Sequence, residues 1–424
     1  MIYNIQDCPR KWYEWLIYPL QMVCAVFVAT VLIANICGTP VSSCLVGAMI
    51  GTLIYQAFTK FKSPMFISSC GATVSAVIGA LGLGNCGANY LAVIIGGCII
   101  AAIYGLFALI TYKFGAKVID KILPPTIVGS ITLVIGINLA GFIPTYVHAN
   151  SITNNWEILI AIITMLTTAI VSHYGKGFIK NIPFLFGLVV GYIAATIFTV
   201  TGIAPIIDFS VFKNINHIFA LPDFTFLHLK DNVIDAAIIG QVVILFVPVA
   251  ICSFCEHLSD HRTLSNIIDV DLTKEPGLHR TLIGDGVASA VGTVVCGLPN
   301  TSYGESIATI GFSKVASVWV TTVAALIIGM LGFIQPFQVL LSSVPSCVFG
   351  GCAMILYGYI AASGLKTLMK NKIDLEDNKN LIVVSVILTV GVSGIWLFNA
   401  AFAGVSLAMV LGIILNLILR PKHN

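Results

Sequence analysis

Long apolar runs, separated by short polar connections, occupy almost the whole chain. Fourteen such runs can be read from the sequence. A helix needs about 20 predominantly apolar residues to cross the hydrocarbon core of a bilayer. The pattern therefore predicts an all-α polytopic membrane protein with fourteen transmembrane segments. These segments are residues 16–37, 41–58, 65–80, 91–112, 124–143, 157–172, 183–203, 234–255, 280–296, 298–312, 315–334, 340–363, 380–397 and 401–419.

The composition supports this class. Hydrophobic residues make up 58% of the chain and charged residues only 9%. A soluble globular domain contains about 25% charged residues, so a large aqueous surface is excluded. The N-terminus is polar and leads directly into the first apolar run, so no cleavable signal peptide is expected.

The basic residues are divided unequally between the two sides of the membrane. When successive connections are assigned alternately to the two sides, one side receives all but two of the 21 Lys and Arg residues, the exceptions being Lys213 and Lys230. The positive-inside rule places the basic side in the cytoplasm. Both termini are therefore expected to be cytoplasmic, and a wrong segment count would have destroyed the alternation.

The third and tenth segments are short and interrupted. Each begins at a proline, Pro64 or Pro299, and passes through small polar residues and glycine before it becomes apolar. Interrupted backbone survives at membrane depth only inside protein or beside a water-filled cavity. The two segments are seven positions apart, an odd number, so the two halves would be inverted relative to each other. This predicts two inverted seven-segment repeats with a binding site between the interrupted segments.

Four carboxylates lie within or at the ends of apolar segments. Glu256 and Asp260 end the eighth segment and share one helix face at their spacing of four. Asp285 begins the ninth segment and Glu305 lies in the tenth. A charge at the bilayer centre costs about 2.5–3.5 kcal/mol on the insertion scale, so such residues are candidates for function. The alternative is that they cap helices at the cytoplasmic boundary, above all for Asp260 and Asp285.

The chemistry of paired carboxylates indicates the kind of ligand. An ionised carboxylate accepts hydrogen bonds and donates none, so two of them suit a neutral solute rich in N–H groups. Like charges in a medium of low dielectric repel, which allows the pair to share a proton. We interpret His257 and His261 as cytoplasmic-end residues rather than ligands. Cys252 and Cys255 are interpreted as buried small hydrophobes, and no metal site or cofactor is expected beyond the proton as coupling ion.

Four strings carry a family resemblance: EHLSDH, DLTKEPGLHRTLIGDG, PNTSYGES and ILYGYIAASGL. They closely resemble the bacterial uracil permeases, members of the nucleobase–ascorbate transporter family of nucleobase:cation symporters, and the likeness covers nearly the whole chain. It implies a core bundle of residues 1–112 and 234–335, and a gate bundle of residues 113–233 and 336–424. It also implies a short extended strand in the third and tenth segments, and a homodimer.

The resemblance also implies the roles of individual residues. Glu256 and Glu305 would hold the N–H groups and edge of a nucleobase. The remaining residues of the implied substrate site are Gly304, Tyr303, Gly71, Ala29 and Tyr357. Proton coupling would involve Asp260, Glu305 and Asp285.

Some positions depart from the uracil permease pattern. Asp260 replaces a histidine tied to proton coupling and, like Asp285, is more similar to the xanthine and urate branch. Gly71 replaces an aromatic residue that stacks on the base, and Ser306 departs from the usual asparagine after Glu305. Glu305 itself favours the uracil branch.

We therefore expect proton-coupled uptake of uracil or a closely related nucleobase across the cytoplasmic (inner) membrane. The alternatives are a xanthine or urate permease of the same family and an anion carrier on the same fold. Anion sites prefer helix N-termini and basic side chains, which the paired acids argue against. A membrane enzyme has no nucleophile–base pair to support it, and no nucleic-acid partner is expected.

Overall fold

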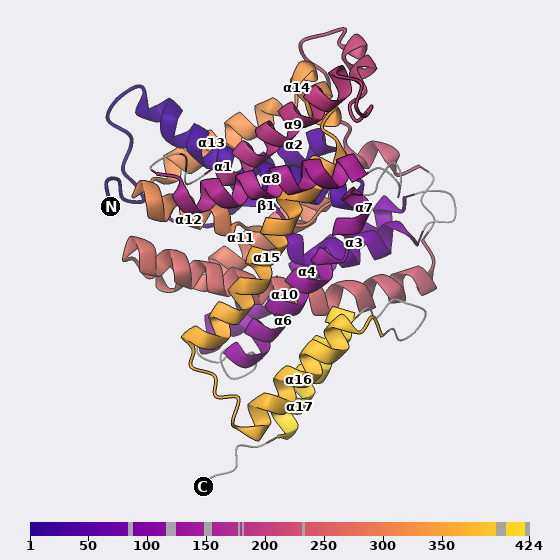
Figure 1. Ribbon diagram of the computed structural model, residues 1–424. Coiled ribbons are helices and arrows are strands. Elements are labelled where there is room, and N and C mark those ends of the chain that lie inside the picture. Colours follow the sequence, from indigo (N-terminus) through magenta and orange to yellow (C-terminus); the bar gives the residue numbers. More distant parts are fainter. Residues whose placement is uncertain are drawn as a thin grey trace.

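The structure of the protein, a computed structural model, describes residues 1–83, 88–115, 124–147, 155–176, 179, 182–230, 234–395 and 404–419. Within these residues, eight helices are long and apolar enough to cross a membrane. Figure 1 shows how the helices are arranged. The chain is therefore a helical, multi-pass membrane protein, as predicted. The eight helices are α1 (Glu14–Cys37), α2 (Val41–Phe58), α4 (Tyr90–Phe114), α6 (Pro125–Ala140) with its continuation α7 (Ile143–Val147), α8 (Asn155–Tyr174), α9 (Pro183–Val200), α10 (Ala236–Ile268) and α15 (Ser346–Lys370).

Shorter helices occupy the remaining apolar segments. They are α3 (Val74–Leu81), α11 (Leu278–Cys296), α12 (Gly304–Ser313), α13 (Val318–Leu331), α14 (Gln335–Ser342), α16 (Asn378–Val392) and α17 (Gly404–Ile418). The predicted twelfth segment is divided, because Pro345 separates α14 from α15. Proline at that point cannot donate a hydrogen bond to continue α14.

The largest departure from the predicted bounds is at α10. The apolar run ends at residue 255, but the helix continues to Ile268. The extension carries residues 256–268, which include Glu256, His257, Asp260 and His261. These polar side chains therefore lie on the last turns of a long helix instead of beyond its end.

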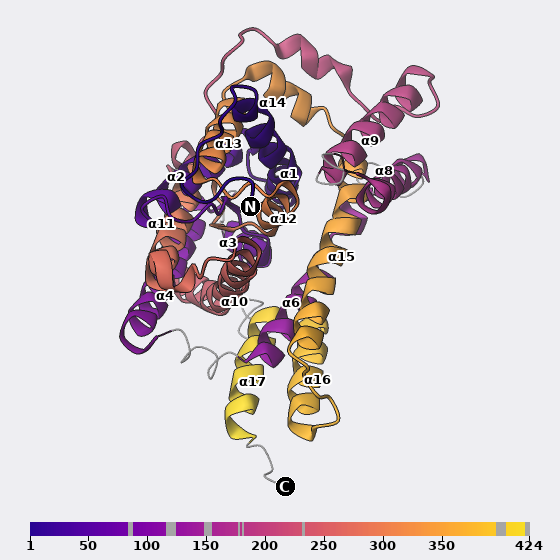
Figure 2. The same cartoon turned by 90° about the vertical axis from the view of Figure 1, so that its left-hand side faces the viewer.

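The helices form two packed groups (Figure 2). In the first group, α11 packs against α2 and α4, α10 packs against α4, and α13 packs against α1 and α2. In the second group, α15 packs along α6 and α8, and α16 packs against α6 and α17. The two groups meet mainly through α10 and α1 of the first and α6, α9 and α17 of the second.

Two short strands meet and pair inside the first group, and we call this paired region the strand crossing. β1 (Ile67–Ser69) pairs antiparallel with β2 (Asn300–Ser302), and all six residues are buried. The register pairs Ile67 with Ser302 and Ser69 with Asn300. The Cys70 N–H donates to the Pro299 carbonyl at 2.8 Å and extends the ladder. The pairing satisfies backbone groups that hydrocarbon could not, so each interrupted segment is a strand followed by a short helix.

The contact between α6 and α15 depends on glycine. A Cβ built at Gly364 would lie 2.4 Å from the Leu133 nitrogen and 2.5 Å from the Gly129 oxygen. These are backbone atoms of α6, which cannot move aside as a side chain could. Small residues that let backbones approach closely are the usual basis of helix packing in membranes.

We expect Gly364→Ala to destabilise the second group. Overpacking a close contact costs about 1–3 kcal/mol, which should lower the apparent melting temperature of the purified protein by several degrees. Gly358→Ala on the same helix is the matched control, because nothing lies within 4 Å of its Cβ position. Equal melting temperatures for the two variants would contradict the packing argument.

Candidate functional site

In each interrupted segment a helical turn begins just after the strand. Because the two strands pair, both helix starts lie near the strand crossing. α12 begins at Gly304, directly after β2, and the 3₁₀ turn Gly71–Thr73 begins after β1 and leads into α3. The first N–H groups of a helix have no partner within that helix. Each interrupted segment therefore offers backbone donors near the crossing of the strands.

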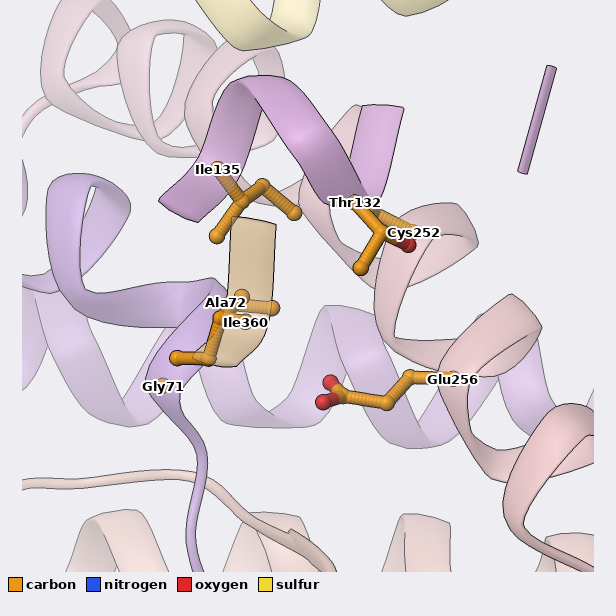
Figure 3. Close-up of a pocket in the computed structure, with 7 residues that line it drawn as sticks. All are labelled: Gly71, Ala72, Thr132, Ile135, Cys252, Glu256 and Ile360. Carbon is orange, nitrogen blue, oxygen red and sulfur yellow. The ribbon is translucent and has the colours of Figure 1, made fainter. Parts of the chain in front are cut away.

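The extended end of α10 carries an acidic stripe, formed by Glu256 and Asp260. Both side chains are half-buried. The Ser302 hydroxyl of β2 donates to Asp260 Oδ2 at 2.9 Å, which ties this turn of α10 to the strand crossing. Figure 3 shows the Glu256 carboxylate extending from α10 into a cavity.

This cavity is a small hollow between the two helix groups, and its empty space of about 310 Å³ includes open solvent. Its walls come from the first group on one side and from α6 and α15 on the other. The lining residues are Gly71, Ala72, Thr132, Ile135, Cys252, Glu256 and Ile360.

The side-chain oxygens of Thr132 and Glu256 on the cavity wall are hydrogen-bond acceptors. Thr132 donates its hydroxyl proton to the Val128 carbonyl at 2.9 Å, so its oxygen is left to accept. Glu256, when ionised, only accepts. A Cβ at Gly71 would meet only Ile33, at 3.8 Å, so the wall is open there. A mainly apolar wall with two acceptors suits a neutral molecule that presents N–H groups.

The structure brings two of the seven predicted substrate residues, Glu256 and Gly71, onto the cavity wall. The other five do not line it. Glu305 is half-buried and Gly304 exposed at the start of α12, which packs against α1 and α10. The remaining three are buried: Tyr303 before α12, Ala29 in α1 and Tyr357 in α15. Their binding roles stay predictions.

Five wall residues were not found from the sequence. Thr132, Ile135 and Ile360 belong to apolar runs in which nothing separates a cavity-facing position from one facing lipid. Ala72 and Cys252 are small residues that are typical of packing positions. The spatial meeting of α10 with α6 and α15 was the missing information.

His257 and His261, interpreted as cytoplasmic-end residues rather than ligands, do not lie beyond the end of the eighth helix. Both are fully buried inside the first group, because α10 does not end at residue 255. His257 Nδ1 lies 2.5 Å from Asp285 Oδ2, and His261 Nε2 lies 2.6 Å from the Tyr55 hydroxyl. Buried polar groups are tolerated when they are hydrogen-bonded. Within the described part of the chain, no group of three or more His, Cys, Asp or Glu side chains is arranged to hold a metal ion.

Comparison with known sequences gives matches over nearly the full length. The model of the Permease family (Xan_ur_permease) matches residues 13–400. The uracil permease of Bacillus subtilis (strain 168) is 35% identical over 426 residues, which cover 98% of this chain and 94% of that protein. The uracil permease of Escherichia coli (strain K12) is 32% identical over 419 residues, covering 95% and 92%.

Comparison with solved structures shows similarity of fold. The transmembrane domain of a cyanobacterium bicarbonate transporter, BicA, has a TM-score of 0.66 at 16% identity, covering 98% of this chain and 100% of that one. The murine Slc26a9 anion transporter in the inward-facing state has a TM-score of 0.70 at 12% identity, covering 97% and 69%. At such identities the likeness extends to the fold alone.

Proposed function

Because the chain belongs to the Permease family, we propose that it transports uracil, or a closely related nucleobase, across the cytoplasmic membrane together with protons. Relatives of full length are named uracil permeases, and the family is one of transporters and not of enzymes. The observation that carries the proposal is the Glu256 carboxylate in a small, mainly apolar cavity between two helix groups.

The cavity chemistry fits a uracil ring. Uracil is flat and neutral and presents two ring N–H groups and two carbonyl oxygens. In this proposal Glu256 accepts from ring N–H, and Glu305 of α12 holds the second N–H edge. The Gly304 backbone N–H donates to a carbonyl oxygen. Tyr303, Ala29, Tyr357 and Gly71 border the ring.

Transport requires the cavity to open to each side in turn. The wall is shared, because Thr132, Ile135 and Ile360 come from the second helix group and Glu256 from the first. We propose that the first group is the core and the second the gate of fourteen segments arranged as two inverted repeats. Rocking one group against the other would then expose the site alternately. A homodimer with cytoplasmic termini is the assembly proposed from the resemblance and the charge distribution.

We propose Asp260 and Glu305 as carriers of the coupling proton. Both are half-buried, and both lie beside the strand crossing that precedes α12. A carboxylate there is accessible when the cavity opens and can be neutralised when it closes. Asp285 was predicted with this pair, but its contacts favour the positioning role argued below.

A panel of nucleobases tests the substrate directly. A ligand at 100 times its Kd stabilises a protein by about 2.7 kcal/mol, so uracil should raise the melting temperature of the purified protein by several degrees. We expect xanthine, urate and bicarbonate to have little effect. Stabilisation by xanthine or urate instead would favour a purine permease. Two features support that alternative: Asp260, and the cavity wall that is open at Gly71.

A further inference from the structure

α10 carries a second stripe, formed by His257 and His261, next to the acidic one. Successive residues of a helix point about 100° apart, so the histidines face α2, α4 and α11 while Glu256 faces the cavity. The two imidazole rings stack with centroids 3.9 Å apart. Neither histidine lines the cavity, so the proposed substrate site gives them no role.

The hydrogen bonds of His257 determine how many protons the His257–Asp285 pair holds. Thr281 donates its hydroxyl proton to the Leu278 carbonyl at 2.9 Å. It can therefore only accept from His257 Nε2, which lies 3.1 Å from its oxygen, so Nε2 carries a hydrogen. A neutral imidazole has one N–H. A single further proton thus occupies the 2.5 Å link between His257 Nδ1 and Asp285 Oδ2, and the pair has no net charge.

The neighbouring histidine of α10, His261, has hydrogen-bond partners in α10 and α2. His261 Nδ1 lies 2.8 Å from the His257 carbonyl oxygen, which only accepts, so Nδ1 carries the hydrogen. His261 Nε2 lies 2.6 Å from the Tyr55 oxygen, and Tyr55 donates its hydroxyl proton to Ser63 Oγ at 2.8 Å. Hydrogen bonds therefore connect His261 both to the backbone of α10 and to α2.

Asp285 is also connected to the strand crossing. Thr301 of β2 directs its hydroxyl to Asp285 Oδ2 at 3.5 Å, while the next residue, Ser302, donates to Asp260. Alternate strand residues point to opposite faces, so β2 lies between the histidine–Asp285 pair and the acidic stripe. The pair thus joins α10, α11 and β2 at one place.

We propose that His257 and Asp285 are positioning residues that set the rotation of α10 and so hold Glu256 in the cavity. The inference rests on the transport function proposed above. Glu256 directly precedes His257, so any rotation that releases His257 from α11 also moves the carboxylate. Asp285 is fully buried and outside the cavity wall. It is therefore placed to hold α10 and not to exchange protons with the substrate site.

The test compares His257→Asn, Asp285→Asn and the double variant in the purified full-length protein. Removing one partner of a buried pair is costly, whereas replacing both partners by neutral groups is often tolerated. We therefore expect His257→Asn to raise the Kd for uracil by at least about tenfold. The double variant should bind uracil with a Kd within about threefold of the wild-type value. Uptake by the double variant in proteoliposomes should keep the wild-type dependence on pH. Tyr55→Phe is the matched control: it removes one bond of the same network and should lower the melting temperature while leaving the Kd unchanged.

Helix rotation is measured separately on a variant whose only cysteine is Cys252, which lies on the cavity wall one turn before Glu256. We expect His257→Asn to change the rate at which a small thiol reagent labels Cys252, and Asp285→Asn on top of it to restore the rate. This readout does not require uracil. Absence of uracil binding by the wild type would defeat the proposed function only.

Three results would overturn the positioning role. An unchanged labelling rate in His257→Asn shows that the pair does not set α10. Failure of the double variant to recover shows that the link itself is not what matters. Recovery of binding with loss of pH-dependent uptake identifies Asp285 as a proton carrier. Should His257→Asn fail to fold, the double variant still distinguishes these outcomes by its binding and pH profile.

Discussion

Glu256→Gln is expected to abolish uracil uptake while the protein still inserts and folds. The amide has the size of the carboxylate but presents an NH₂ group, so one ring N–H would lose its charged acceptor. A hydrogen bond to a charged group contributes about 1.5–3 kcal/mol, which corresponds to a roughly tenfold to hundredfold loss of affinity. Uptake of radiolabelled uracil in cells that lack their own uracil transporter measures the effect.

The matched control for this change is Glu275→Gln. Glu275 lies in the connection between α10 and α11, where its exposed side chain pairs with Lys62 at 2.5 Å. The same chemical change there should leave uptake near the wild-type rate. Glu305→Gln provides a second measurement on α12, with the same expected loss. Normal uptake by both the Glu256 and the Glu305 variants would remove the paired acids from substrate binding.

Asp260→Asn is expected to separate uracil movement from the proton gradient. One pH unit is worth about 1.4 kcal/mol per proton, hence about tenfold accumulation of uracil for each proton coupled. Under the proposed coupling, acid on the uptake side should drive accumulation by the wild type in proteoliposomes. Asparagine keeps an acceptor for the Ser302 hydroxyl, which lies 2.9 Å from Asp260, but it cannot bind and release a proton. The variant should therefore exchange uracil without concentrating it.

Asp269→Asn is the matched control on the same helix. Asp269 is exposed and caps the C-terminus of α10 in the left-handed conformation, with φ at 58°. Asparagine tolerates that conformation, so accumulation should be unchanged. Tenfold accumulation by Asp260→Asn at one pH unit would move the coupling proton to another group, with Glu305 the next to test.

Several features of the fold were predictable because they depend on local chain chemistry. The apolar runs predicted α1, α2 and α4 to within a few residues, since a crossing helix needs about 20 predominantly apolar residues. The polar stretch beginning at Pro299 predicted an interruption, and the chain there forms β2 followed by α12. Glu256 was predicted as a site residue because a carboxylate in an apolar segment is costly and is therefore usually kept for a function; it lines the cavity, and its binding role stays a prediction.

The failures concern contacts between residues far apart in the chain. The hydrophobic pattern ends α10 at residue 255, but Asp285 and Tyr55 supply partners that allow His257 and His261 to continue the helix inside the protein. The hydrophobic pattern of one segment does not show which distant residues will be its hydrogen-bond partners.

Composition and hydrophobic periodicity are therefore sufficient for the membrane class, the position of most helices and the interrupted segments, because each follows from the solvent that a segment meets. The cavity is different in kind. Thr132, Ile135 and Ile360 become its wall only where α6 and α15 meet α10. Apolar side chains have the same free-energy preference for lipid as for a protein interior, so packing between distant helices selects which of them face the ligand.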